Sequence, residues 1–183
     1  AGTMAGHLAR LIEDEADRYF FMFGYSMGAI LAFETLVASN PLVLQRCLGL
    51  FVAARAAPDH QSRTAALHTL DDPCFVERLR ELAGVPEEVL ANQDLMELLL
   101  PMLRSDFRLS ECYQLTHKAV LPIPITALYG ENDPYADKDA TLGWSHYTSA
   151  GFQHNIFPGG HFFINEHKCR LKATVQNVIK ARL

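Results

Sequence analysis

Residues 19–31 read YFFMFGYSMGAIL, and this stretch decides the fold. Tyr19 to Phe23 supply apolar side chains to both faces of a strand, which suits the centre of a parallel sheet covered by helices on each side. Gly24 ends the strand. Met27 to Ala38 is apolar around most of its circumference and predicts a deeply packed helix, closed by Asn40 and the proline after it. A buried strand that runs through a glycine turn into a buried helix is the setting of a nucleophile elbow.

The turn itself, Gly24-Tyr25-Ser26-Met27-Gly28, has the pattern GxSxG. We expect small residues at both glycines because strand and helix approach closely, and a strained Ser26 whose hydroxyl projects above the sheet. Ser26 is then a candidate nucleophile, and the backbone N–H of Met27 a candidate oxyanion donor at the start of the helix. The alternative is that Ser26 only caps the helix.

Two later turns can supply the acid and the base, which follow the serine in this order on such a fold. Asp133 comes after the predicted strand 123–129, and His161 comes after the predicted strand 152–157, in a glycine turn. His161 is the candidate general base, and Asp133 would hold its imidazole, although Asp133 can also be only an Asx-turn residue. The competing acids are Glu131, Asp137 and Asp139. Three other histidines are assigned no role: His146 in a helical stretch, His154 in a strand and His167 in the last helix.

The rest of the chain alternates strand and helix signals. Residues 4–18 predict an amphipathic helix through Met4, Leu8, Leu11 and Ile12, with Glu13, Asp14 and Asp17 turned away, and residues 48–54 predict another buried strand. This pattern indicates one α/β domain over residues 1–183, built on a parallel sheet. Residues 72–115 carry only helical signals and are apolar, which is more typical of a cap over a site than of a solvated spacer.

The composition argues against several classes of protein. The 183 residues are 49% hydrophobic with a formal net charge of −5, the wrong sign for overall attraction to nucleic acid or an anionic membrane. No apolar run approaches the roughly 18 residues of a membrane span, and the first residues do not resemble a signal peptide, so we expect a soluble, cytoplasmic protein. The four cysteines, Cys47, Cys74, Cys112 and Cys169, lack metal-site spacing and predict buried, reduced thiols.

Five blocks of the sequence resemble the type II, or external, thioesterases that accompany nonribosomal peptide and polyketide synthases, within the α/β-hydrolase superfamily. The blocks are GYSMGAILAFE, LGLFVAARAAPD, LLLPMLRSDFRLSECY, LYGENDP and FPGGHFFI, in that family's order and with similar spacing. The usual elbow of the family has His where this chain has Tyr25.

The resemblance implies an α/β-hydrolase fold with helices on both faces of a mostly parallel sheet and a cap at 72–115 lining an acyl chamber. It implies cleavage of acyl thioesters from the phosphopantetheine arm of acyl or peptidyl carrier proteins, through an acyl-enzyme on Ser26, with no cofactor. We expect a monomer. Such carriers are acidic, so docking needs a basic surface on this chain. The alternative is that its basic residues form only a solvated charged face. The candidates are Arg78, Arg80, Arg104 and Arg108 in the cap, or Lys168, Arg170 and Lys172 in the last helix.

By the same resemblance, family members carry more residues before the helix that opens this chain, which hold the first strands and a loop with a second oxyanion N–H. We therefore expect an N-terminally incomplete domain that is poorly active or misfolded alone. Two alternatives stay open. One is a carboxylesterase for small molecules, and the other is an inactive hydrolase fold that acts only as a binding protein.

Overall fold

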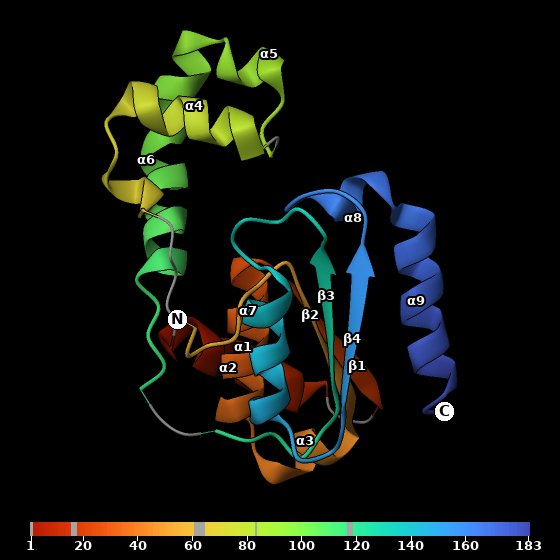
Figure 1. Ribbon diagram of the computed structural model, residues 1–183. Coiled ribbons are helices and arrows are strands. Elements are labelled where there is room, and N and C mark those ends of the chain that lie inside the picture. The colour runs from red at the N-terminus through yellow and green to blue at the C-terminus, as the bar shows by residue number, and fades with distance from the viewer. Residues whose placement is uncertain (1, 16–17, 61–64, 83, 117–118) are drawn as a thin grey trace. The chain divides into compact units, whose positions relative to one another are not determined.

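The computed structural model describes residues 2–15, 18–60, 65–82, 84–116 and 119–183 (Figure 1). The chain forms two compact units. The first consists of Ala1–His60 and Leu115–Leu183, and the second of Gln61–Gln114.

The first unit is built on a four-stranded sheet in the order β1-β2-β3-β4, in which neighbouring strands pair in parallel (Figure 1). The strands are β1 Phe20–Tyr25, β2 Cys47–Ala53, β3 Ile125–Gly130 and β4 Phe152–Phe157. The predicted parallel α/β sheet is therefore confirmed. β3 begins two residues later than the predicted 123–129, because Pro124 has no N–H to give to the ladder.

The position of β1 differs from the prediction. Within the described residues β1 pairs with β2 alone and lies at an edge of the sheet, not at its centre. Its side chains are mostly half-buried, and Phe23 is 41% exposed. An apolar run on both faces indicates that helices or loops cover the strand, but it does not tell how many strands flank it.

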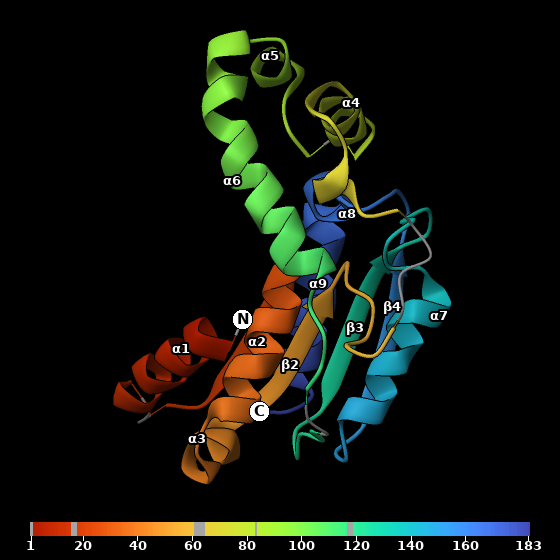
Figure 2. The ribbon, with the colours of Figure 1, turned by 90° about the vertical axis from the view of Figure 1, so that its left-hand side faces the viewer.

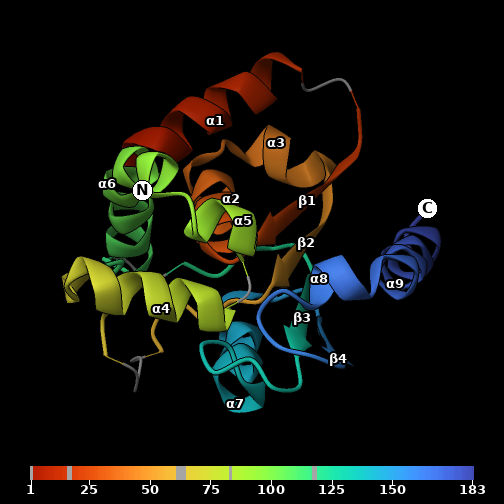
Figure 3. The same ribbon diagram turned by 90° about the horizontal axis from the view of Figure 1, so that it is seen from above.

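Helices cover both faces of the sheet. Figures 2 and 3 show α1, α2 and α7 on one face and α9 on the other. The helical elements are α1 Gly2–Asp14, α2 Met27–Ala38, α3 Pro41–Arg46, α7 Lys138–Leu142, the 3-10 helix η2 Gly143–Tyr147, α8 Phe163–Glu166 and α9 Lys168–Lys180.

The two faces have separate apolar cores. On one face the ring of Phe33 in α2 meets Trp144 and Tyr147 edge-on, each at a centroid distance of 5.4 Å. Phe33 is fully buried, which confirms the predicted deep packing of α2. On the other face Leu171 and Val175 of α9 pack against a buried cluster that consists of Phe51, Ala53, Ala54, Leu128, Phe157 and Phe163.

The first helices depart from the prediction in two places. α1 ends at Asp14 and buries Ala5 and Ala9, whereas Met4 and Leu11 are 51% and 61% exposed, so the predicted contact face is wrong at these positions. Small alanines let α1 approach α2 more closely than Met and Leu would allow. Residues 16–17 of the predicted helix lie outside the described residues, Asp17 among them.

After α2 the chain turns at once into α3, a helix that the sequence interpretation did not predict. Asn40 is the N-cap of α3, and its side chain accepts a hydrogen bond from Val43 N at 3.0 Å. The Asn-Pro pair that was expected only to close one helix therefore also opens the next.

In the second unit every described element is helical, as predicted for 72–115, with Ala83 outside the described residues. The elements are the 3-10 helix η1 Leu67–Thr69, α4 Asp72–Leu82, α5 Glu87–Leu90 and α6 Gln93–Glu111. Phe75 of α4 packs edge-on against Phe107 of α6, with ring centroids 5.4 Å apart. The Glu111 carboxylate at the end of α6 accepts the N–H groups of Leu67 and His68 at 2.8 and 3.1 Å, which fixes η1.

The cysteines are free, but the prediction that all are buried is wrong. Cys47 is buried at the start of β2, whereas Cys74, Cys112 and Cys169 are exposed on helices or at a helix end. Apolar neighbours in sequence lie on other faces of a helix, so they do not decide whether a helical cysteine is covered. Within the described residues, none of the helices is both long and apolar enough to cross a membrane.

Candidate active site

The turn between β1 and α2 holds Ser26 in a backbone conformation that L-residues rarely adopt, with φ 52° and ψ −121°. The Ser26 N–H donates to the carbonyl of Ala53 at 2.8 Å, which ties the turn to the end of β2. A Cβ at Gly24 would lie 2.4 Å from both Ala29 Cα and Gly28 O, so this glycine is required. The expectation for Gly28 is wrong, because a Cβ there would meet nothing within 4 Å.

The hydroxyl of Ser26 does not cap the helix. Ser26 stands at the N-cap position of α2, but its side chain makes no capping hydrogen bond. Its Oγ lies instead 3.1 Å from His161 Nε2. The Ser26 hydroxyl therefore bonds to His161 and does not form the α2 cap that the alternative interpretation required.

His161 joins the serine to a carboxylate from a third segment of the chain. Its Nδ1 lies 2.9 Å from Asp133 Oδ2, and the Asp133 side chain is fully buried. A carboxylate can only accept here, so Nδ1 donates its proton, and Nε2 is left to accept a proton from the Ser26 hydroxyl. Three predicted residues that are far apart in the sequence thus form one hydrogen-bonded chain.

The turn after β3 explains why Asp133 is the acid that reaches His161. Asp133 Oδ1 accepts the N–H of Tyr135 at 2.9 Å while Oδ2 bonds to the imidazole, so Asp133 is both an Asx-turn residue and the partner of His161. Asp137 instead caps α7, where its side chain accepts from Ala140 N at 2.8 Å. Asp139 lies within α7 and Glu131 is exposed.

Gly130, at the end of β3, brings the acid turn and the histidine turn together. A Cβ on Gly130 would lie 2.2 Å from Gly160 O and 2.8 Å from Gly159 O. The N–H of Asn132 donates to Gly159 O at 2.9 Å across the same approach. The sequence marked Gly130 only as the end of a strand, because the turn that it contacts lies far away in the chain.

Tyr25 is a site residue whose partner the sequence did not reveal. Its hydroxyl donates to the backbone carbonyl of His161, and its ring lies 5.6 Å from the imidazole and 6.0 Å from Phe162. Burial, and to a lesser degree the charge of Asp133, raises the pKa of Tyr25 far above its ordinary value, so the hydroxyl stays a donor.

The other histidines lie apart from this chain of hydrogen bonds. His154 is in β4 as predicted, bonds to Thr141 Oγ1 at 2.8 Å and stacks on Tyr129. Burial, with a smaller effect of the Lys138 charge, lowers its pKa. His146 is exposed in η2, and His167 lies between α8 and α9, not inside the last helix as predicted.

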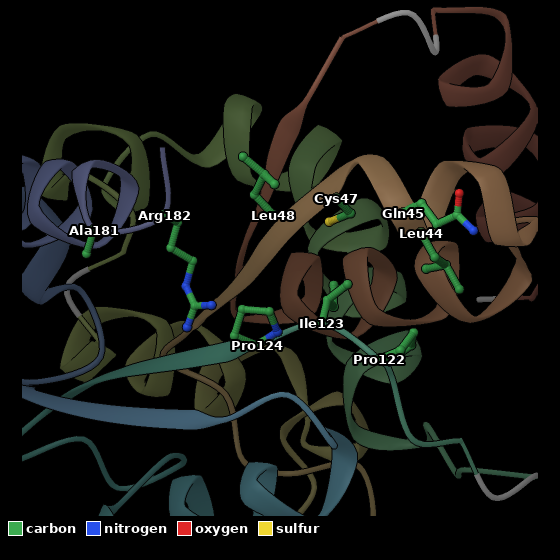
Figure 4. A pocket seen from close by; sticks show the side chains of 9 residues that line it. All are labelled: Leu44, Gln45, Cys47, Leu48, Pro122, Ile123, Pro124, Ala181 and Arg182. Atoms are coloured by element: carbon green, nitrogen blue, oxygen red, sulfur yellow. The ribbon is translucent and has the colours of Figure 1, made fainter.

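A cavity of about 320 Å³ lies at the end of the sheet opposite to the Ser26 turn (Figure 4). It is lined by Leu44, Gln45, Cys47, Leu48, Pro122, Ile123, Pro124, Ala181 and Arg182. These residues surround the amino ends of β2 and β3, whereas Ser26 follows the carboxyl end of β1. The cavity therefore does not belong to the Ser26 site. Across the described ranges, no three His, Cys, Asp or Glu side chains gather as metal ligands would.

Comparison with known proteins gives the family. The model of the thioesterase domain family matches residues 1–181. The chain belongs to the thioesterase family. The parallel sheet and its helices agree with the α/β-hydrolase fold of solved thioesterases.

Two relatives and one solved structure are similar to this thioesterase domain. The thioesterase PikA5 of Streptomyces venezuelae is 38% identical over 144 residues, which are 79% of this chain and 51% of PikA5. The linear gramicidin dehydrogenase LgrE of Brevibacillus parabrevis is 32% identical over 99% of this chain and 70% of LgrE. The type II thioesterase YbtT, from the yersiniabactin NRPS/PKS pathway, superposes with a TM-score of 0.82 at 29% identity, over 100% of this chain and 75% of YbtT.

These relatives are longer than the thioesterase domain described here. The chain spans about half the length of PikA5 and 70% of LgrE. The name of LgrE denotes a redox reaction, whereas the family model, PikA5 and YbtT all denote thioester cleavage.

Proposed function

We propose that this thioesterase domain hydrolyses acyl thioesters on the phosphopantetheine arm of acyl or peptidyl carrier proteins, through an acyl-enzyme on Ser26. The observation that carries the proposal is the position of His161, which bonds to Ser26 Oγ at 3.1 Å and to Asp133 Oδ2 at 2.9 Å. A serine hydroxyl needs a base at this distance to become a nucleophile, and the base needs a partner that fixes its tautomer.

In the first half-reaction Ser26 Oγ attacks the thioester carbonyl carbon while His161 Nε2 takes the hydroxyl proton. The negative charge moves to the carbonyl oxygen, where the N–H of Met27 at the start of α2 donates to it. The C–S bond then breaks, and the imidazolium returns its proton to the departing thiolate. Buried Asp133 stabilises the imidazolium throughout this step.

In the second half-reaction water attacks the acyl-serine ester and His161 Nε2 takes a proton from the water. The C–O bond to Ser26 breaks, the serine oxygen takes back the proton, and a free carboxylic acid leaves. The reaction needs no redox step and no cofactor of the protein, because the phosphopantetheine arm belongs to the substrate.

The nature of the leaving group and the relatives together support a thioester on a carrier. A thiolate leaves readily, so nucleophile activation and oxyanion stabilisation are the main tasks of the site. YbtT is a type II thioesterase of an NRPS/PKS pathway and PikA5 is a thioesterase, which supports a carrier-bound thioester as the substrate of this chain. The proposal also includes a cytoplasmic location and a monomeric state. Three exposed free thiols fit a reducing compartment.

The helical insertion, residues 72–115, is proposed as the cap that lines the acyl chamber. α6 presents exposed apolar side chains at a spacing that places them on one stripe of the helix: Leu95, Leu98, Met102 and Leu109. An exposed stripe of this kind suits contact with an acyl chain. The cap arginines fit carrier docking less well, since Arg78, Arg80 and Arg104 form ion pairs with acidic side chains of the same unit.

The proposal is tested by comparing the hydrolysis of an acyl-phosphopantetheinyl carrier protein with that of a short aryl ester. We expect a higher kcat/KM for the carrier substrate, and loss of both activities in Ser26→Ala but not in the control Ser149→Ala, which removes an exposed hydroxyl. A strong preference for the aryl ester would favour the carboxylesterase alternative. Carrier hydrolysis that persists in Ser26→Ala would refute the acyl-enzyme.

A further inference from the structure

We infer that Tyr25 is a positioning residue, whose hydroxyl fixes the distance between Ser26 and His161 by holding the main chain of the histidine. The inference rests on the proposed function. It concerns a residue that lies directly before the candidate nucleophile and touches no reacting atom.

The turn that carries His161 is held at three successive carbonyl groups. Gly159 O accepts from Asn132 N at 2.9 Å, and Gly160 O accepts from Phe163 N at 3.2 Å. The third carbonyl, that of His161 itself, accepts from the Tyr25 hydroxyl. The first bond comes from the acid turn and the second from α8, so among these three only Tyr25 comes from the strand that carries the nucleophile.

This bond closes a small ring of contacts around the proton-transfer step. Tyr25 and Ser26 are neighbours in the chain, and each of them bonds to His161, one to its carbonyl and the other to its imidazole. The main chain and the side chain of His161 are therefore both anchored at the carboxyl end of β1. A shift of the histidine turn away from the nucleophile would have to break both bonds at once.

The surroundings of the phenol make the bond a persistent one. The Tyr25 ring packs against Phe162 and Phe163 with centroid distances of 6.0 and 6.5 Å, and it borders the buried cluster on the α9 face. The raised pKa of Tyr25 keeps the hydroxyl protonated over the range in which a histidine base works. A phenylalanine at position 25 would keep the ring packing and lose only the donor.

The inference is tested with Tyr25→Phe and the matched control Tyr147→Phe. Tyr147 is also buried, and its hydroxyl bonds to Asp59, in a different part of the same unit. The first assay is the second-order rate constant for labelling of Ser26 by a fluorophosphonate, which requires an activated serine but no carrier protein. Urea unfolding of each variant measures what the lost hydroxyl costs in stability.

We expect Tyr25→Phe to label about 10-fold more slowly than the wild type. This lies between the small effect of one hydrogen bond lost in an unchanged geometry and the roughly 100-fold effect of a 1 Å misplacement. With a thioester substrate the decrease should appear in kcat, with KM within about two-fold, because Tyr25 acts through His161. Tyr147→Phe should label at the wild-type rate even if it unfolds as easily as Tyr25→Phe.

A spectroscopic readout separates positioning from general destabilisation. The N–H at His161 Nδ1 donates to Asp133, and its proton gives a low-field NMR signal. This signal should broaden or shift in Tyr25→Phe and stay unchanged in Tyr147→Phe. Equal labelling by Tyr25→Phe and wild type would overturn the inference and leave the proposed function intact. Equal slowing in both variants would also overturn it, since stability alone would then explain the rates. If the wild type is folded but the fluorophosphonate does not label its Ser26, the proposed function itself is overturned.

Discussion

Substitution of Gly130 by alanine tests how closely the acid and histidine turns must approach. The added Cβ would lie 2.2 Å from the carbonyl oxygen of Gly160 and 2.8 Å from that of Gly159. Ordinary contacts between such atoms begin at about 3.5 Å, so the Gly160 carbonyl has to retreat by roughly 1 Å. It is a main-chain atom and cannot rotate away as a side chain would.

Movement of the Gly160 carbonyl also displaces His161, because Gly160 directly precedes His161 in the chain. The bond between His161 Nδ1 and Asp133 Oδ2 is 2.9 Å long, and a further displacement of about 1 Å takes it beyond hydrogen-bond range. We therefore expect kcat to fall about 100-fold in Gly130→Ala. The free energy of unfolding should fall by about 1–3 kcal/mol, as in other overpacked sites.

Steady-state hydrolysis of an acyl-thioester and urea unfolding measure the two effects. The matched control is Gly49→Ala in the neighbouring strand β2, where the new Cβ would meet the ring of Phe21 at 3.3 Å, a side chain that can give way. The control should keep kcat near the wild-type value. Wild-type turnover and stability in Gly130→Ala would refute the close approach of the two turns.

Three further predictions concern the elbow, the acid and the cap. Gly24→Ala should lower the free energy of unfolding by about 1–3 kcal/mol, whereas Gly28→Ala, with open space around it in α2, should raise it by about 0.5–1 kcal/mol; equal urea midpoints would contradict this difference. Asp133→Asn should leave the circular dichroism unchanged but lower kcat about 10⁴-fold through the wrong imidazole tautomer, and wild-type kcat would rule out its role. Leu98→Lys, at a position 75% exposed, should change stability by less than about 0.5 kcal/mol yet raise KM for long acyl chains more than for short ones. An equal KM change for both chain lengths would argue against the cap lining an acyl chamber.

Much of the sheet and the chemistry-bearing turns could be predicted, because both depend on local patterns. Apolar runs that meet a glycine place the strand ends to within about a residue, since β1 runs past Gly24 to Tyr25 and β3 ends at Gly130 itself. Parallel strands then bring their carboxyl ends to one edge. Ser26, Asp133 and His161 each follow such an end, so their proximity follows from the topology without any knowledge of side-chain positions.

The features that were missed depend on contacts between distant segments. The partner of the Tyr25 hydroxyl is 136 residues away, and no local pattern reveals it. The need for glycine at position 130 likewise comes from the carbonyls of another turn. The edge position of β1 and the exposure of Cys112 depend on which elements cover them, and hydrophobic patterns report only that an apolar residue is present.

The most direct test of the central claim is to identify the residue that carries the acyl group during turnover. An acyl-phosphopantetheinyl carrier protein is mixed with the chain, the reaction is quenched with acid within milliseconds to seconds, and the peptides are analysed by mass spectrometry. We predict an acyl ester on Ser26 that appears with the release of thiol, decays with the release of acid, and does not form in His161→Ala. Thioester hydrolysis without any acyl group on Ser26, or an acyl group that forms at the wild-type rate without His161, would contradict the account.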